Sequence, residues 1–195
     1  DSQVKLSAVP AGYEPFYISH FSRHGSRYLI SDNDLDNVIV PLRKAAKAGA
    51  LTPEGLRVLD VCERFYEEMR GRGGELTPLG ERQHRGIARR MYDANRKAFG
   101  KDAAVTAVST PVMRCAYSMM AFTEALKELD PTLNIPRESS NRNMYYLNHH
   151  TKESNAWNDD PDNVKTTLSN FRESKTQPER LMKVLFNNPE YVKKH

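Results

Sequence analysis

FSRHGSRYL, residues 21–29, crowds two arginines around a histidine and a glycine, directly after the apolar run PFYISHFS at 15–22. Aromatic and β-branched residues in a short run predict a buried strand, which we expect to end near Ser22. A second run of small and β-branched residues, AAVTAVST at 103–110, predicts another strand that also ends in polar residues. The charged motif therefore stands at the carboxyl end of a predicted strand.

Thr-Pro pairs predict where helices begin. Each pair fits an N-cap threonine followed by proline at the first helical position, where the missing N–H of proline costs nothing. Apolar residues recur at helical spacing after each pair, GRGG at 71–74 ends the first helix, and a weaker helical pattern follows Pro178. The pairs are Thr52–Pro53, Thr77–Pro78 and Thr110–Pro111.

The order strand, helices, strand, helix predicts an α/β fold with a central, mainly parallel sheet flanked by helices. We expect residues 1–145 to form this core. From about Tyr145 the sequence becomes polar and loses its periodicity, so we interpret residues 146–195 as the beginning of a helical cap lobe.

Composition excludes several classes of protein. The 195 residues carry 29 Lys and Arg against 25 Asp and Glu, a net charge of +4 without any basic tract, which argues against a nucleic-acid partner. No apolar run reaches the roughly 18 residues of a membrane span. Cys62 and Cys115 lie in no metal-ligand pattern, and we interpret them as small buried residues; a disulfide between them stays open.

Arg114 follows the second predicted strand, as Arg23 and Arg27 follow the first. Ligands of open α/β sheets bind at the carboxyl ends of the strands. We therefore expect the three guanidinium groups to converge, and their planar forks match the oxygens of a phosphate group.

A histidine inside such a clamp has a specific chemistry. One imidazole nitrogen of His24 can attack phosphorus and form a phosphohistidine, while the arginines neutralise charge on the transferring group. Gly25 lets the backbone approach the phosphate closely, and the neighbouring cations should hold His24 neutral. An isolated R-H-G triplet can occur by chance, and a lone histidine near a strand end is more often structural, so the prediction rests on both motifs together.

The combination of SRHGSR (22–27) with STPVMRCAYS (109–118) resembles the histidine phosphatase superfamily. It is most similar to the histidine acid phosphatase branch, whose signature begins R-H-G-x-R-x-P. LTPLGERQHRGIARRM (76–91) and the pair Arg114–Cys115 resemble the multiple inositol-polyphosphate phosphatases and their bacterial relatives. The resemblance covers residues 15 to about 150 and implies the N-terminal part of such a protein only, with an incomplete sheet.

The resemblance implies a phosphomonoester hydrolase that acts on inositol polyphosphates or a broader range of phosphomonoesters. It makes His24 the nucleophile and Arg23, Arg27 and Arg114 ligands of the scissile phosphate. It puts the helix opened by Thr77, Pro78 and Gly80 behind the site. It also implies no metal or organic cofactor, a phosphorylated small molecule and the remaining C-terminal part of the same phosphatase as partners, and a periplasmic or secreted location.

Two positions depart from the family pattern. Leu29 stands where the signature has proline. More seriously, the family needs a later histidine followed by an acid that protonates the leaving oxygen. His149–His150 is followed by Thr151, and His195 is the last residue, so neither fits. The chain is then a piece of a cleaved phosphatase, a truncated one, or a short relative that binds phosphate without turnover.

Two other functions stay open. Because the proton donor is missing, the chain could be a module that binds a phosphorylated ligand without catalysis. Because the R-H-G motif is shared, it could be a phosphotransferase that resembles phosphoglycerate mutase, although the S-T-x-x-x-R region fits the acid phosphatase branch better.

Overall fold

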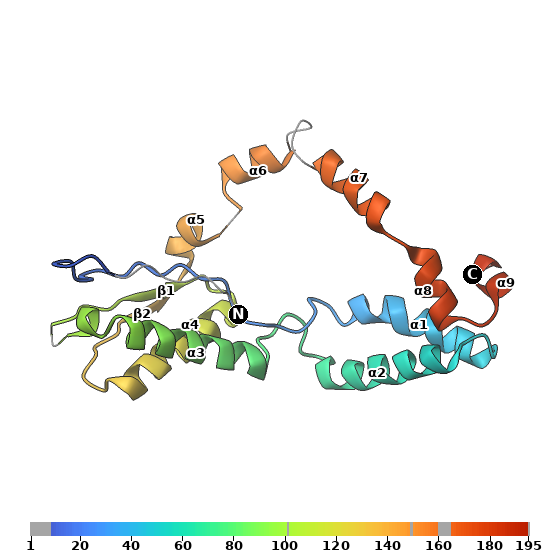
Figure 1. Cartoon of the computed structure of the whole chain (residues 1–195), viewed down its shortest axis with the longest axis horizontal. Coiled ribbons are helices and arrows are strands. Elements are labelled where there is room, and N and C mark those ends of the chain that lie inside the picture. Colours follow the sequence, from blue (N-terminus) through green and yellow to red (C-terminus); the bar gives the residue numbers. More distant parts are fainter. Residues whose placement is uncertain (1–8, 101, 149, 160–164, 195) are drawn as a thin grey trace. The chain divides into compact units, whose positions relative to one another are not determined.

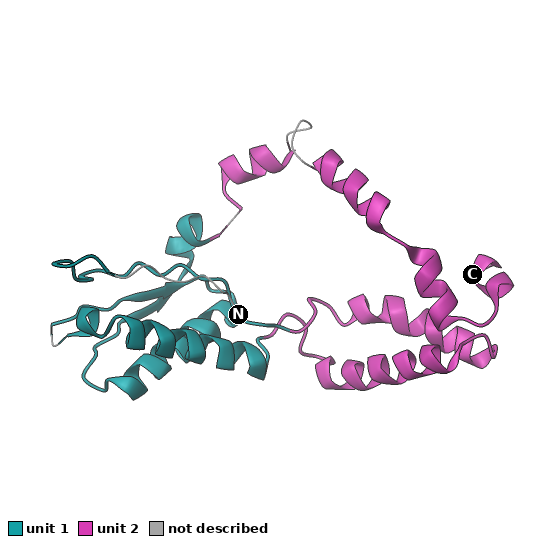
Figure 2. Cartoon of the chain, in the orientation of Figure 1, with its two compact units in different colours: residues 1–27, 76–147 teal, residues 28–75, 148–195 magenta. Residues whose placement is uncertain are grey.

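The computed structural model describes residues 9–100, 102–148, 150–159 and 165–194, and these form two compact units (Figures 1 and 2). Unit 1 comprises Asp1–Arg27 and Leu76–Leu147, and unit 2 comprises Tyr28–Glu75 and Asn148–His195. The chain passes between the units after Arg27, Glu75 and Leu147. The sequence predicts one boundary, after residue 145, and gives no sign that the segment 28–75 belongs to a second unit.

Unit 1 is built on two long helices, α3 (Pro78–Ala94) and α4 (Met113–Leu129), which pack against each other. Both helices contribute to the buried cluster of this unit, which also includes residues that follow each helix. Arg85 of α3 reinforces the packing from outside through ion pairs with Glu124, at 3.4 Å, and Glu128 of α4. The cluster comprises Ala88, Phe99, Ala125, Leu126, Leu133 and Ile135.

The parallel sheet of unit 1 has two strands among the described residues, β1 (Ala107–Ser109) and β2 (Arg137–Ser139). They pair in the register Ala107↔Arg137 and Ser109↔Ser139. A parallel strand pair beside helices agrees with the predicted α/β class, whereas the larger central sheet is not formed by the described part of the chain. Short helices complete the unit: η1 (Arg96–Phe99), η2 (Asn141–Asn143) and α5 (Met144–Leu147).

The sequence predicts a strand at 15–22, and this prediction is wrong: in the described structure these residues form no strand. Ile18 packs against the cluster of unit 1, and the His20 ring stacks on Phe122 with centroids 5.1 Å apart. Phe16, by contrast, is 94% exposed. A strand needs a hydrogen-bonded neighbour, and no described segment supplies one, so side chains alone hold this stretch.

The N-caps test the Thr-Pro predictions individually. Thr77 accepts a hydrogen bond from the Gly80 N–H at 3.1 Å and opens α3, as predicted. Thr52 accepts from the Gly55 N–H at 3.0 Å and opens α2 (Pro53–Met69), also as predicted. Thr110 does not cap: α4 begins at Met113, and its N-cap residue is Val112, which has no side-chain acceptor.

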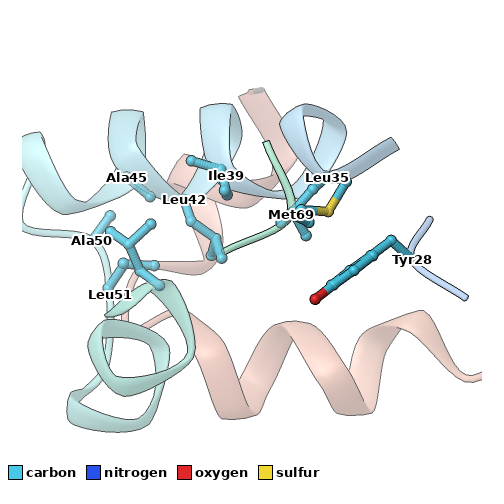
Figure 3. Packing of buried hydrophobic residues seen from close by; sticks show 9 residues of the cluster. Tyr28, Leu35, Ile39, Leu42, Ala45, Ala50, Leu51 and Met69 are labelled. Carbon is cyan, nitrogen blue, oxygen red and sulfur yellow. The ribbon is translucent and has the colours of Figure 1, made fainter. Parts of the chain in front are cut away.

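Unit 2 is helical, with α1 (Asn33–Lys47) packed on α2 (Pro53–Met69) and α8 (Pro178–Leu185) packed on α2. The sequence analysis assigned no element to α1. Figure 3 shows Ile39 and Leu42 of α1 pointing toward the interior that Met69 of α2 also fills. The buried set is Tyr28, Leu35, Ile39, Leu42, Ala45, Ala50, Leu51, Leu59 and Met69.

Three further helices belong to unit 2: α6 (Lys152–Asp159), α7 (Lys165–Lys175) and α9 (Pro189–Lys194). The helix expected after Pro178 is confirmed as α8, and its Leu185 carbonyl accepts from the Thr52 N–H at 2.9 Å. The function of residues 146–195 as a cap lobe stays a prediction.

The exclusions drawn from composition can be compared with the structure. In the described ranges, no helix has both the length and the apolar character that a bilayer span requires. Within the same ranges, His, Cys, Asp and Glu side chains form no group of three or more that could hold a metal ion. Cys62 and Cys115 are both free thiols, so the disulfide left open by the sequence is not formed.

Candidate functional site

The histidine loop, which we define as residues 22–27, is fastened to the first turn of α3. A Cβ atom on Gly25 would lie 2.4 Å from the Gly80 carbonyl oxygen, and one on Gly80 would lie 2.3 Å from the Ser26 carbonyl oxygen. Two backbones can approach this closely only where both residues lack a side chain. Gly25 was expected to let the backbone approach a phosphate, whereas in the structure it lies in close contact with α3.

Hydrogen bonds strengthen the same junction. The Thr77 N–H and hydroxyl both donate to the Ser26 carbonyl, each at 2.9 Å. The Ser26 N–H in turn donates to the Gln83 side-chain oxygen at 2.9 Å. The first turn of α3 therefore lies behind the loop and fixes its path, as the resemblance implies.

Ser118 ties the loop to the second helix. Its hydroxyl accepts from the Gly25 N–H at 3.1 Å and donates to the Arg114 carbonyl, one turn earlier on α4, at 2.8 Å. The residue is only 3% exposed. One buried hydroxyl thus sets the position of His24 relative to the turn of α4 that carries Arg114, and the sequence analysis did not single it out.

The ring of His24 has a defined tautomer. Its Nδ1 lies 2.8 Å from the Gly25 carbonyl oxygen. A carbonyl oxygen can only accept, so Nδ1 carries the hydrogen and, in the neutral ring, Nε2 keeps its lone pair. Nε2 is therefore the nitrogen available as a nucleophile.

Burial lowers the pKa of His24 below its ordinary value, which the hydrogen bond to Gly25 partly opposes. The charges of Arg114, Arg23 and Arg27 lower the pKa further. The predicted direction is therefore confirmed, although desolvation and not the arginines is the largest cause. The four residues that the sequence analysis selected lie close enough for their charges to act on one ring.

An open cleft of about 400 Å³ begins at this loop and continues along α3. Arg23 and His24 line it, whereas Arg27 and Arg114 do not. Arg82, Gln83 and Arg90 of α3 face this cleft, and no motif in the sequence singled them out. The lining residues are Ser22, Arg23, His24, Gly25, Arg82, Gln83, His84, Gly86, Ile87 and Arg90.

His84 lies at the buried edge of the cleft and is 5% exposed. Burial lowers its pKa most, a hydrogen bond to the Arg23 backbone opposes this, and the charges of His20 and His24 lower it again. Because it holds the Arg23 backbone, His84 supports the histidine loop next to His24. The only sign of this role in the sequence is that His84 stands seven residues after the Thr77 cap.

The expected proton donor is not found at this site. Among the residues lining the cleft there is no Asp or Glu. His149 and His195, which the sequence analysis weighed as partners of an acid, lie outside the described residues. The described lining of the cleft therefore combines two imidazoles, those of His24 and His84, with three arginines and no carboxyl group.

Among known proteins, this chain is similar to solved structures of a phosphatase. The chain matches no protein-family model and no curated protein. It does match solved structures of the multiple inositol polyphosphate phosphatase of Bifidobacterium longum. The TM-score is 0.71 for the complex with inositol hexasulfate and 0.68 for both the phosphate complex and the apo form.

The identity is 21% in each case, and the match covers 97% of this chain but only 45–46% of the phosphatase. The chain thus spans about half the length of those structures. We conclude that it has the fold of about half of a multiple inositol polyphosphate phosphatase.

Proposed function

We propose that this chain carries the nucleophile and the phosphate ligands of a phosphomonoester hydrolase that works through a phosphohistidine. The observation that carries the proposal is the state of His24. Its Nδ1–H is engaged by the Gly25 carbonyl, its Nε2 forms no hydrogen bond with a described residue, and three guanidinium charges act on the ring. A neutral, oriented imidazole among fixed cations is what in-line attack on a phosphate dianion requires.

The reaction then proceeds in two displacements. The Nε2 lone pair attacks phosphorus, the P–O ester bond breaks, and the leaving alkoxide takes a proton from a general acid. Water next attacks the phosphohistidine and gives a proton back to the deprotonated general acid, the P–N bond breaks, and inorganic phosphate leaves with Nε2 restored. Arg23, Arg27 and Arg114 bind the transferring oxygens in both steps.

The general acid belongs, in this proposal, to the remaining C-terminal part of the same phosphatase. Two observations support this. The described cleft lining contains no carboxyl group, and the chain spans only about half the length of the phosphatase it matches. A phosphate monoester with an ordinary alcohol leaving group needs that proton, so the chain by itself should act only on activated esters.

Inositol polyphosphates, or phosphomonoesters more broadly, are the substrates we propose. The matched phosphatase was crystallised with inositol hexasulfate and with phosphate, which supports a phosphorylated small molecule as the ligand class. A periplasmic or secreted location remains a prediction that rests on the sequence resemblance alone.

A second function, binding of a phosphorylated ligand without turnover, is favoured by one observation, namely the lack of a carboxyl group around the described cleft. Dinitrophenyl phosphate separates the two functions, because its leaving group departs without a proton. If the first function holds, the 195-residue chain releases dinitrophenolate in a burst and His24→Ala abolishes it. If the chain binds phosphate but gives no burst, the binding module is correct and the hydrolase proposal fails.

A further inference from the structure

The arginines of α3 fall into two pairs with different surroundings. Arg85 and Arg89 face α4 and form ion pairs with its glutamates, Arg89 with Glu128 at 3.4 Å. Arg82 and Arg90 line the cleft instead, and neither forms an ion pair with any residue that the structure describes. One helix therefore presents neutralised charge on one side and unneutralised charge on the other.

Gly86 leaves room for the side chain of one cleft arginine, Arg90, to fold over the helix. A Cβ atom on Gly86 would lie 3.2 Å from an Nη1 atom of Arg90, so the Arg90 guanidinium folds back over Gly86. Gly86 lies midway between Arg82 and Arg90, about 6 Å along the helix axis from each. The folded side chain therefore directs its charge toward the turn that carries Arg82.

The cleft is also larger than one phosphate group needs. Its volume of about 400 Å³ lies in the range of pockets that hold whole small molecules. His24 and Arg23 are among the lining residues, whereas Arg27 and Arg114, the other cations that act on His24, are not. Space and positive charge thus extend from the nucleophile along α3, with no carboxyl group among the lining residues to oppose an anion.

We propose that Arg82 and Arg90 form a second anion subsite, which binds a phosphate group of the substrate other than the one transferred to His24. This rests on the proposed function, since it assumes a phosphoryl group at His24, and it deepens that function by naming the side chains that bind the part of the substrate that is not transferred. The substrate carries at least two phosphate groups on a compact scaffold. Guanidinium forks suit the second group because they bind phosphate oxygens in pairs.

Binding of a non-hydrolysable polyanion tests the subsite independently of catalysis. Isothermal titration calorimetry on the full chain compares inositol hexasulfate with inorganic phosphate. We expect Arg82→Ala and Arg90→Ala each to weaken inositol hexasulfate about tenfold, the loss of one charge-assisted hydrogen bond, while inorganic phosphate binds unchanged. Arg89→Ala is the matched control: it removes the same charge from the adjacent position and should leave both affinities unchanged.

Three results would overturn the subsite. Equal weakening in Arg89→Ala and Arg90→Ala would mean diffuse attraction to a basic helix. Equal loss of phosphate and inositol hexasulfate affinity would place these arginines at the His24 phosphate itself. Unchanged inositol hexasulfate affinity in all variants, or none in the wild type, would remove the subsite altogether. None of these readouts depends on phosphoryl transfer, so the subsite and the hydrolase proposal can fail separately.

Discussion

Replacing Gly25 by alanine should push the histidine loop away from α3. The new Cβ atom would lie 2.4 Å from the Gly80 carbonyl oxygen and 2.6 Å from the Gly80 Cα, whereas ordinary contact begins at 3.4 Å. One backbone must therefore retreat by about 1 Å, and no flexible side chain can move in its place. Gly25 has no positive φ, so the cost is steric and not conformational. Overpacking of this kind costs about 1–3 kcal/mol of unfolding free energy.

Urea unfolding followed by far-ultraviolet circular dichroism measures that loss, and calorimetry with inorganic phosphate measures the effect on the site. Gly100→Ala is the control, because its φ is −64° and its Cβ atom would lie 3.6 Å from the nearest atom, the Lys97 carbonyl oxygen. It should be neutral or stabilise the fold by up to about 1 kcal/mol. If Gly25→Ala unfolds at the wild-type urea concentration and binds phosphate normally, the close contact between loop and helix is refuted.

Three further predictions follow from the same unit. Ser118→Ala leaves the Gly25 N–H without its acceptor, so unfolding free energy should fall by about 1–3 kcal/mol and that amide should exchange faster; unchanged exchange would contradict the bond. Thr77→Ala removes a helix cap and should lower the unfolding free energy by about 1–2 kcal/mol in urea; an unchanged unfolding free energy would mean that the cap does not stabilise the helix. His24 and His84 have lowered pKa values, so the unfolded chain takes up protons near pH 6.5 that the folded chain resists. Stability should therefore fall as pH drops below 6.5, and a flat profile would refute the shifts.

Helix positions were predictable where local chemistry decides them. Thr77 with Pro78 predicted the first residue of α3, because a cap and a fixed φ act within one turn. The same reasoning failed at Thr110, where the chain continues for three residues past the threonine before α4 begins at Met113. The threonine signal is local, but whether a helix starts there depends on how the end of β1 leaves the sheet.

Strands, and the helix α1 that was not predicted, depend on contacts with other segments of the chain. The run at 15–22 has strand composition, yet no described segment pairs with it, because pairing is a property of the whole fold. β2 was missed since its three residues, Arg137–Ser139, carry no apolar alternation. For α1, Leu35, Ile39 and Leu42 do recur at helical spacing, but Pro41 lies inside the helix and opposes that pattern.

The residues of the candidate site were also predictable only in part. Arg23, His24, Arg27 and Arg114 could be selected from two motifs, and their charges do act on one ring. The strand expected before the first motif is not formed by the described residues 15–22, so the expected geometry was only partly right. Their roles in binding and transfer stay predictions. Ser118 could not be selected, since a serine on a helix gives no sign that a backbone N–H approaches it from 93 residues away.

Trapping the phosphoenzyme tests the central claim most directly. The full chain is mixed with dinitrophenyl phosphate, quenched in alkali to preserve phosphohistidine, digested and sequenced by mass spectrometry. The account predicts a phosphoryl group on Nε2 of His24, absent in His24→Ala and reduced in Arg114→Ala. A phosphoryl group on another residue, or none on a chain that demonstrably binds phosphate, would contradict it.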